Sequence, residues 1–221
     1  ANIAHQWRQP LTELNLTLFN MKKASINHNE EKIQELYKES KTLISSMSST
    51  IEDFTNFFNP QKDKKSFEIK SAINEALFIL KKLLEIENIN IQINIPNNYK
   101  IIGVANELSQ VIVNLIQNSK DAFIQNNIKD KTIIIDVKEQ IIQSKKYLLL
   151  EIKDNAGGIN KKHIEKIFDP YFTTKHKSQG TGLGLFMSKM IIEKSLEGEL
   201  SHKNCDDGSI FTITILAEEE K

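Results

Sequence analysis

The chain lacks the features that stabilise small secreted proteins or anchor a protein in a bilayer. Its 221 residues include one cysteine, Cys205, which excludes an internal disulfide and fits a reducing compartment. No apolar run approaches the ~20 residues that a membrane-spanning helix needs, and no signal-peptide pattern is present. We therefore expect a cytoplasmic chain without membrane contact of its own. A helical pattern is already under way at the first residues, so we expect a piece of a longer protein.

An excess of charge of either sign is lacking as well. Lysine plus arginine and aspartate plus glutamate each total 29, so the formal net charge is zero. This argues against the broad basic surface of a nucleic-acid-binding protein. The five histidines and the single cysteine show no metal-ligand spacing, and there is no internal repeat. With 39% hydrophobic and 26% charged residues, the chain is long enough for one large domain or two modest ones that bury a core.

Two long helices are predicted at the N-terminal end, over residues 3–26 and 33–57. Apolar residues recur at spacings of three and four in the first, at Leu11, Leu14, Leu18 and Met21. The second has a heptad-like seam of Ile33, Leu36, Ser40, Leu43, Met47, Thr50, Phe54 and Phe57. Two such helices cannot bury all of their apolar faces alone. We expect an all-α helical hairpin over residues 1–59 that forms a four-helix bundle on dimerisation.

After a charged linker at residues 60–65, the sequence changes from long helical patterns to alternating helix and strand patterns. We expect helices at 71–87, 104–127, 161–167 and 182–195. We expect strands at 89–95, 101–102, 131–142, 146–154, 197–203 and 209–216, the first of them half-buried because it alternates strictly. Helices beside a largely antiparallel sheet make an α+β domain over residues 66–221.

Two stretches of this domain carry polar groups at chemically suggestive spacing. Asn114 and Asn118 lie four residues apart and share one side of a helix, where amide oxygens suit Mg²⁺ or simply face solvent. The stretch DNAGGI, residues 154–159, follows a strand. Its aspartate either begins a turn or accepts a hydrogen bond from an exocyclic amine, while the glycines let a flat ring approach.

Two further stretches suggest an anionic ligand. GTGLGL, residues 180–185, opens a helix, and glycines with helix N-terminal amides form a cradle for phosphate. No βαβ unit surrounds it and no Walker lysine is present, which excludes a Rossmann fingerprint and a P-loop. IFDPYFTTKHKSQ, residues 167–179, is typical of a hinge and mobile cover, or of an ordinary surface loop with a small apolar cluster.

In this order and spacing, the four stretches resemble the N, G1, F and G2 boxes of the Bergerat (GHKL) fold. That ATP-binding fold is shared by histidine kinases, gyrase-type topoisomerases, Hsp90 and MutL. With the helical hairpin in front, residues 1–216 resemble the transmitter module of a two-component sensor histidine kinase. The resemblance implies a Bergerat-type α+β sandwich behind the hairpin, ATP and Mg²⁺ as cofactors, homodimerisation, and a response-regulator receiver domain as partner.

The resemblance also implies which residues bind the nucleotide. Asn118 would be the Mg²⁺ ligand, with Asn114 beside the phosphates, and Asp154 would recognise the adenine amino group. Ala156 stands where the family more often has glycine. The further positions carried over are Lys120, Asp121, Gly157, Gly158, Phe172, Thr174, Lys175, Gly180, Thr181, Gly182, Leu183, Gly184 and Leu185.

HQWRQP, residues 5–10, matches the H box of that family, so His5 is the expected phosphoacceptor. A histidine nucleophile needs one unprotonated ring nitrogen while the other holds a proton. Gln6 departs from the acidic residue that is usual at its position and supplies no negative charge. Gln9 lies one turn after His5, where related kinases with phosphatase activity carry a residue that positions water. Pro10 is expected to bend the helix next to His5.

Three functions are compatible with this pattern. The leading hypothesis is autophosphorylation of His5 from ATP, followed by transfer to an aspartate of a receiver domain. The second is a phosphatase-biased or nucleotide-gated regulator-binding module with weak autokinase activity, because Gln6 replaces the acid. The third is a hydrolysing Bergerat ATPase. Against it stands Asn114, an amide where the hydrolysing relatives have a glutamate that activates water.

Overall fold

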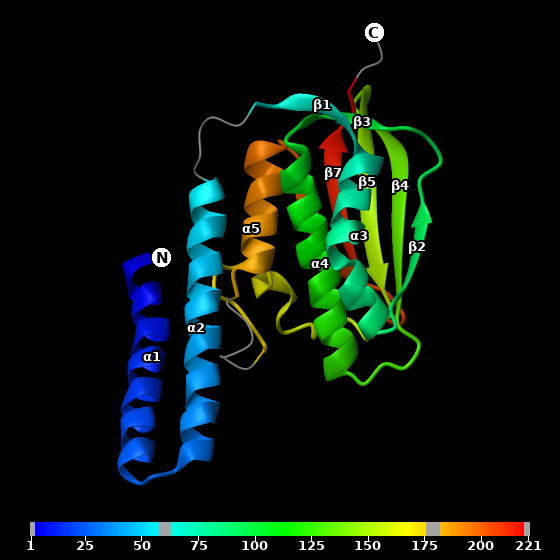
Figure 1. The fold of residues 1–221 in the computed structure, drawn as a ribbon. Helices are drawn as coiled ribbons and strands as arrows, with labels where there is room; N and C mark the ends of the chain where they lie inside the picture. Colours follow the sequence, from blue (N-terminus) through cyan, green and yellow to red (C-terminus); the bar gives the residue numbers. More distant parts are fainter. Residues whose placement is uncertain (1–2, 58–62, 176–181, 219–221) are drawn as a thin grey trace. The chain divides into compact units, whose positions relative to one another are not determined.

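The computed structural model describes residues 3–57, 63–175 and 182–218, apart from the side chains of residues 3–10, 46 and 49–57. The chain divides into two compact units. One comprises residues 1–60 with 169–183, and the other comprises residues 61–168 with 184–221. Within the described ranges, none of the helices combines the length and the hydropathy that crossing a bilayer requires. Figure 1 shows the elements in chain order.

The N-terminal unit contains the predicted helical hairpin, made of α1 (Ile3–Ile26) and α2 (Glu30–Phe57). The turn between them places His28 in the left-handed region, with φ of +50°. Asn29 caps α2, because its side-chain Oδ1 accepts the backbone N–H of Lys32 at 2.9 Å. Two glutamates in the first turn of α2 also stabilise the helix, because their negative charges lie at the positive end of the helix dipole. The second helix therefore begins at Glu30, three residues before the predicted start.

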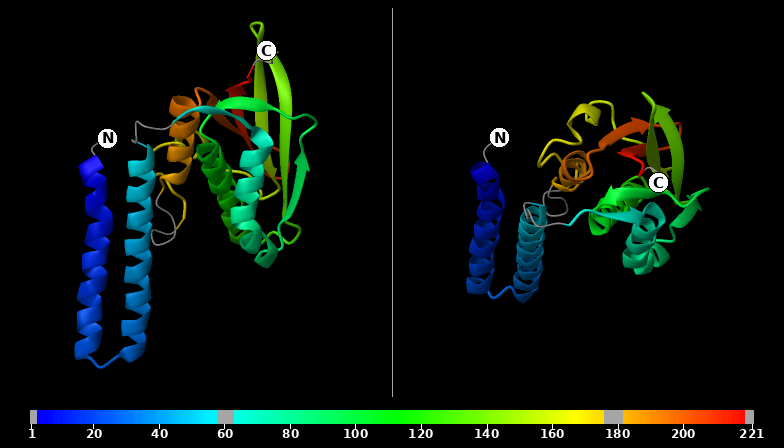
Figure 2. Two further views of the ribbon diagram at one scale, coloured as in Figure 1. Left: turned by 45° about the horizontal axis from the view of Figure 1, so that its top comes forward. Right: turned by 90° about the horizontal axis from the view of Figure 1, so that it is seen from above.

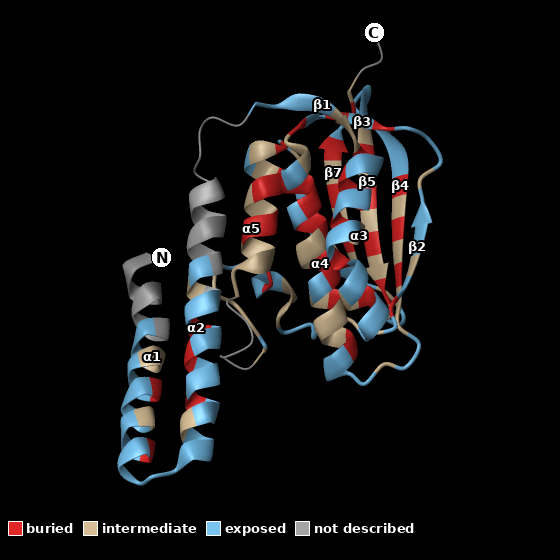
Figure 3. Cartoon of the chain, viewed as in Figure 1, coloured by how far each residue is buried: buried red, intermediate tan, exposed pale blue. Residues whose placement is uncertain are grey.

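In the hairpin the buried residues lie on the sides of α1 and α2 that face each other, and most other described residues are exposed (Figure 3). Several of the exposed residues are large and apolar. On α2 the predicted seam is confirmed at Leu36, Ser40 and Leu43, which are all buried. On α1 the buried residues are Thr17 and Ala24, while Leu11 and Leu18 of the predicted apolar stripe are each 47% exposed in the single hairpin. The apolar residues of α1 spread over more than one face, and one partner helix covers only one of them. Other large apolar side chains left exposed on the hairpin are Leu16, Phe19, Ile26, Tyr37 and Ile44.

The second unit is built on a five-stranded sheet in the order β2-β4-β5-β7-β6. β2 pairs with β4 in parallel, and the other neighbours are antiparallel, which confirms the largely antiparallel prediction. A two-stranded sheet pairs β1 with β3. The strand bounds are β1 (Lys65–Glu68), β2 (Asn90–Asn94), β3 (Lys100–Gly103), β4 (Thr132–Ile142), β5 (Lys145–Asp154), β6 (Glu199–Asn204) and β7 (Ser209–Leu216).

Three helices cover one face of the five-stranded sheet, as the views from the front and from above show (Figures 1 and 2). They are α3 (Ile69–Ile86), α4 (Ala105–Gln125) and α5 (Gly184–Met190). Strand residues alternate between this core and the opposite face, so that Ile133, Ile135 and Val137 of β4 are at most 1% exposed. The opposite face carries polar pairs such as Lys138 and Glu151, whose Nζ and Oε2 atoms lie 2.8 Å apart. The predicted α+β sandwich is confirmed.

Three predicted elements differ from the structure, and one strand was missed. The helix predicted at 161–167 is a short 3₁₀ turn, Ile164–Lys166. The helix predicted at 182–195 begins at Gly184 and changes after Met190 into a π-helix, Ile191–Ser195. The strand predicted as half-buried, β2, lies at the sheet edge and is mostly exposed. β1 was not predicted, because its four residues are stabilised by pairing with the distant β3.

Candidate functional site

Asp154 ends β5 with a carboxylate that is almost completely buried, at 4% exposure. Its Oδ2 accepts a hydrogen bond from Ser119 Oγ at 2.8 Å. Its Oδ1 accepts two backbone N–H groups, from Ala156 at 2.9 Å and from Ser209 at 3.2 Å. Each carboxylate oxygen can accept two hydrogen bonds, so Oδ2 retains a lone pair for one further donor. The carboxylate is therefore held in one orientation, with acceptor capacity left over.

Burial raises the pKa of Asp154 above its ordinary value of 3.8, because the charged form loses its hydration. The hydrogen bonds from Ala156, Ser119 and Ser209 act in the opposite direction, since they stabilise the carboxylate. A carboxyl group with a raised pKa in a buried polar setting is typical of a binding or catalytic site.

The loop after Asp154 brings its backbone close to neighbouring segments. Gly157 and Gly158 have φ values of +90° and +75°, which side chains rarely adopt. The loop is held at Ala156, whose carbonyl accepts the Asn126 side-chain amide at 2.5 Å. It is held again at Ile159, which exchanges two hydrogen bonds with the side chain of Asn204, at 2.7 and 2.8 Å. A rigid, glycine-lined loop beside a carboxylate acceptor suits a flat, amine-bearing ring.

Gly208 lies against the backbone of Asp154. A Cβ at Gly208 would overlap the carbonyl oxygen of Asp154, so any side chain there would displace the end of β5. The next residue, Ser209, supplies one of the three donors to the Asp154 carboxylate. The end of the turn between β6 and β7, at Gly208 and Ser209, is therefore part of the site.

Asn114 lies on α4, where it fixes the start of α5. Its Nδ2 donates to Ser188 Oγ at 2.8 Å, and Ser188 is 2% exposed. A Cβ at Gly184 would overlap Asn114 Oδ1, so the backbone of α5 approaches this side chain as closely as a glycine allows. The structure thus brings together two predicted site residues, Asn114 and Gly184. Leu185, also predicted, follows within the first turn of α5 and is half-buried.

The remaining α4 residues lie within one turn of Ser119. Asn118 is half-buried and directly precedes it. Lys120 and Asp121 form a contact between ammonium and carboxylate, with side-chain exposures of 22% and 30%. Among the described residues, no three histidine, cysteine, aspartate or glutamate side chains are grouped to hold a metal ion. The amide oxygen of Asn118 is of the hard, oxygen-donor type that Mg²⁺ prefers, and Mg²⁺ needs few protein ligands.

Seven predicted residues belong to the segment 169–183, which groups with the N-terminal unit, and five of them are described. Its two ends meet, since a Cβ at Gly182 would overlap the backbone of Tyr171, and both residues have positive φ values. Lys175 N–H donates to Thr173 Oγ1 at 3.1 Å, which closes a small turn beside Thr174. The other two, Phe172 and Leu183, are half-buried. The segment has the closed ends of an Ω-loop.

Some predicted residues fall outside the described part of the structure. Gly180 and Thr181 are not described at all. His5, Gln6 and Gln9 lie in helix α1 by their backbone, but their side chains are not described. Their roles stay predictions from the sequence.

Sequence reasoning missed several residues that hold the site together: Ser119, Asn126, Ser188, Asn204, Gly208 and Ser209. One of them could have been recognised from the sequence. Ser119 continues the apolar face of α4 four residues after Leu115, and a serine on a core-facing position needs a buried hydrogen-bond partner. The partner, Asp154, lies 35 residues further along the chain and is not evident from local pattern.

Comparison with known proteins gives three findings. Residues 103–219 match the family model described as histidine kinase-, DNA gyrase B- and HSP90-like ATPase. Two curated relatives are the two-component sensor PprA of Pseudomonas aeruginosa, 27% identical over 97% of this chain and 24% of that protein, and sporulation kinase A of Bacillus subtilis, 30% identical over 87% and 30%. The chain thus spans about a quarter to a third of the length of these relatives.

Among solved structures, the chain resembles histidine kinase ThkA, crystallised in complex with the response regulator protein TrrA. The TM-score is 0.69 and the identity 21%, with coverage of 98% of this chain and 60% of the other. This likeness supports the arrangement of a helical region followed by an α/β sandwich.

Proposed function

The chain belongs to the histidine kinase-, DNA gyrase B- and HSP90-like ATPase family as a two-component sensor histidine kinase transmitter module, and on that premise we propose that it transfers the γ-phosphoryl group of ATP to His5. His5 would then pass the group to an aspartate of a receiver domain. We propose that the hairpin at residues 1–59 carries the phosphoacceptor, that residues 60–65 form a linker, and that residues 66–221 form the ATP-binding domain. A cytoplasmic location stays a prediction.

The observation that carries the proposal is the setting of Asp154. Three protein donors orient its buried carboxylate, and Oδ2 keeps a lone pair for one more. An exocyclic amine of a purine would fill that position, with the ring lying along the loop at Gly157 and Gly158. Guanine and hypoxanthine carry a carbonyl oxygen at the corresponding position of the ring, which would face the carboxylate unfavourably. Asp154 therefore selects adenine.

The residues for the phosphates and metal come from α4 and from the segments on either side of Gly184. Asn118 would hold Mg²⁺ through its amide oxygen, and the ion would supply neutralisation of the phosphate charge. Asn114 keeps the start of α5 against α4 through Ser188, so that Gly184 and Leu185 have a fixed position. Thr174, Lys175 and Gly182 would contribute from the loop at 169–183.

His5 acts as nucleophile through an unprotonated ring nitrogen. A bond forms between this nitrogen and phosphorus as the bond to the ADP oxygen breaks, and the other ring nitrogen keeps its proton. In the transfer to the receiver domain, the histidine nitrogen is the leaving group: an aspartate oxygen attacks phosphorus, and the bond between phosphorus and nitrogen breaks. Asn114 supports transfer over hydrolysis, because an amide cannot take a proton from water.

The partners follow from surface chemistry and from the relatives. The apolar side chains of α1 and α2 that remain exposed suit a second hairpin, which supports a homodimer with a four-helix bundle. ThkA was crystallised with a response regulator, and this supports a receiver domain as the partner of the present chain.

Gln6 favours a second candidate function. It provides no negative charge beside His5, so autophosphorylation would be slow, while Gln9 one turn later would position water for removal of phosphate from the regulator. This phosphatase-biased or nucleotide-gated alternative shares the nucleotide site of the first.

The deciding experiment incubates the chain with γ-labelled ATP and Mg²⁺, beside the His5→Ala and Asp154→Ala variants. Acid-labile, base-stable label on the parent chain alone is the expected result. Labelling of His5→Ala would remove His5 as the acceptor. If the parent binds ATP and stays unlabelled, while Asp154→Ala does not bind, the autokinase fails and the regulator-binding alternative takes its place.

A further inference from the structure

We infer that His202 is a positioning residue of the base-binding site, where it holds Ser209 so that the backbone amide of Ser209 completes the set of donors on Asp154. The inference deepens the proposed function, because it rests on Asp154 being the group that reads adenine. His202 would act through Ser209 and would not touch the nucleotide. It would therefore tune selectivity for the base.

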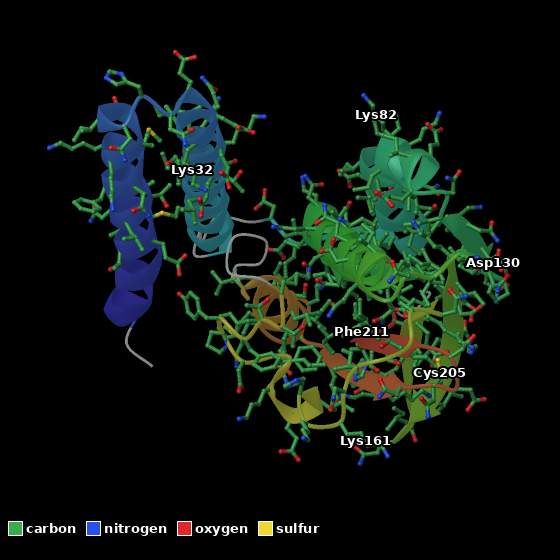
Figure 4. All side chains as sticks on the ribbon, turned by 90° about the horizontal axis from the view of Figure 1, so that it is seen from below. Lys32, Lys82, Asp130, Lys161, Cys205 and Phe211 are labelled. Atoms are coloured by element: carbon green, nitrogen blue, oxygen red, sulfur yellow. The ribbon has the colours of Figure 1, made fainter. Side chains whose placement is uncertain are left out.

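His202 lies on β6, directly opposite Phe211 of β7. Its Nε2 is 3.2 Å from the hydroxyl oxygen of Ser209. Its ring packs on Phe211 with centroids 4.8 Å apart, and Phe211 in turn meets the edge of Phe168 at 6.5 Å. Phe211 lies inside the second unit, among the strands at the lower side of Figure 4. These ring contacts fix the direction of the imidazole, so Nε2 remains aimed at Ser209.

The ring is neutral at physiological pH. Burial lowers the pKa of His202 from 6.5 to about 4, because the charged form would lose its hydration. Nδ1 is buried and has no hydrogen-bond partner within the described part of the chain. A proton on Nδ1 would be left unsatisfied, so the favoured tautomer carries it on Nε2 and donates to Ser209 Oγ. Two charged groups lie close to the residues that His202 contacts: the Asp154 carboxylate, which accepts the backbone N–H of Ser209, and Lys189, whose Nζ lies 4.9 Å from the centroid of the Phe168 ring.

Ser209 joins this histidine to the base-reading carboxylate. It is 4% exposed and begins β7, immediately after the turn at Gly208. Its backbone N–H reaches Asp154 Oδ1 at 3.2 Å, the longest of the three hydrogen bonds on that carboxylate. A bond already at the long end of the range weakens most when its donor shifts. The side chain of Ser209 is anchored by His202, and this anchor keeps the donor within reach.

Loss of the hydrogen bond between His202 and Ser209 should weaken the binding of adenine nucleotides in particular. A carboxylate that is held by two donors instead of three has more freedom to turn, so it presents Oδ2 to an exocyclic amine less often. A purine without that amine gains nothing from the carboxylate in the first place. The effect therefore appears in the preference for ATP over inosine triphosphate (ITP), whose hypoxanthine base lacks the amine.

The test measures the dissociation constants of ATP and ITP for the parent chain, four single variants of β6 and β7, the double variant His202→Phe/Ser209→Ala, and Asp154→Asn. His202→Phe keeps the ring contact with Phe211 and removes the nitrogen, and His202→Gln replaces Nε2 with an amide of similar reach. Ser209→Ala removes the acceptor from the other side. Ser201→Ala, on the exposed face of the same strand, is the matched control.

The expected result is a preference for ATP over ITP that falls roughly two- to tenfold in His202→Phe and in Ser209→Ala, the range for one hydrogen bond. We expect His202→Gln to stay within about twofold of the parent, and Ser201→Ala to match it. The double variant His202→Phe/Ser209→Ala should lose no more than either single variant, because both remove one interaction.

Three results would overturn the inference. If His202→Phe, or Ser209→Ala should the former not fold, weakens ATP and ITP equally, the histidine only supports the fold. If the preference for ATP is unchanged in these variants but is lost in Asp154→Asn, the proposed base site stands and His202 has no part in it. A parent chain that does not distinguish ATP from ITP removes the adenine-reading role of Asp154, and the inference falls with it.

Discussion

Asn114 of α4 donates its side-chain amide to the hydroxyl of Ser188 on α5, at 2.8 Å. The two residues lie 74 positions apart, and the bond joins α5 to α4. On the other side of the same amide, Gly184 approaches so closely that a Cβ would overlap Asn114 Oδ1. One asparagine therefore sets the position of the glycine-bearing stretch, in addition to its expected place beside the phosphates.

Replacing Asn114 with alanine should destabilise the second unit. Ser188 is 2% exposed, so its hydroxyl would lose a donor that water cannot readily replace, at a cost of about 1–3 kcal/mol in the free energy of unfolding. Urea unfolding of Asn114→Ala measures this cost. Gln117→Ala, exposed on the same helix, is the control and should be nearly neutral. The double variant Asn114→Ala/Ser188→Ala should recover part of the loss; a simple sum of two independent losses would contradict the link.

Gly208→Ala should displace the backbone at Asp154 and so disrupt the site proposed for the adenine base. The added methyl group would overlap the carbonyl oxygen of Asp154 and force the end of β5 to move. Overpacking of this kind costs about 1–3 kcal/mol in the free energy of unfolding. We expect ATP affinity to fall as well, because the displaced segment carries the carboxylate. Asp206→Ala, an exposed change in the same turn, is the control, and equal ATP affinity in the two variants would refute the expectation.

Much of the fold was predictable because its signals are local. The spacing of Leu36, Ser40 and Leu43 identifies the buried side of α2. The helix α4 and the β4–β5 hairpin likewise follow from their own periodicity. β1 was missed for the opposite reason, since the four residues KSFE have no period to read and owe their form to pairing with β3.

The candidate site was predictable only in part. The aspartate of DNAGGI was identified from its motif, but its orientation depends on Ser119 and Ser209, which lie 35 and 55 residues away. Neither serine belongs to a recognisable motif of its own. Which polar residues meet in a core is decided by helix-on-sheet packing, and a single sequence does not state that packing. The role of Gly184 shows the same limit, because its neighbour Asn114 is 70 residues earlier in the chain.

The exposed apolar face of α1 should be the dimer contact. Leu18 is 47% exposed in the single hairpin, and burying such a side chain contributes about 1.5–3 kcal/mol. Leu18→Glu should therefore raise the dimer dissociation constant by about ten- to a hundredfold. Light scattering or sedimentation over a range of concentrations measures this. Asn20→Glu adds the same charge on the opposite side of the helix and should leave the dimer intact, whereas equal dissociation of both variants would point to net charge as the cause.

His202 should make the stability of the second unit depend on pH. Burial lowers the pKa of His202 to about 4 in the folded chain, while the unfolded chain binds a proton near the ordinary 6.5. Between these values the unfolded state binds more protons, so the contribution of His202 is fully present above pH 6.5 and is lost as the pH falls towards 4. The pKa of Asp154 is raised by burial and acts with the opposite sign, but this group is common to the parent and to His202→Phe. The difference in unfolding free energy between these two chains should therefore be level above pH 6.5 and should decline below it. Urea unfolding from pH 4.5 to 8 measures this difference, with Ser201→Ala as a control that carries no titrating change. A difference that does not vary with pH would show that His202 is not held in its neutral form.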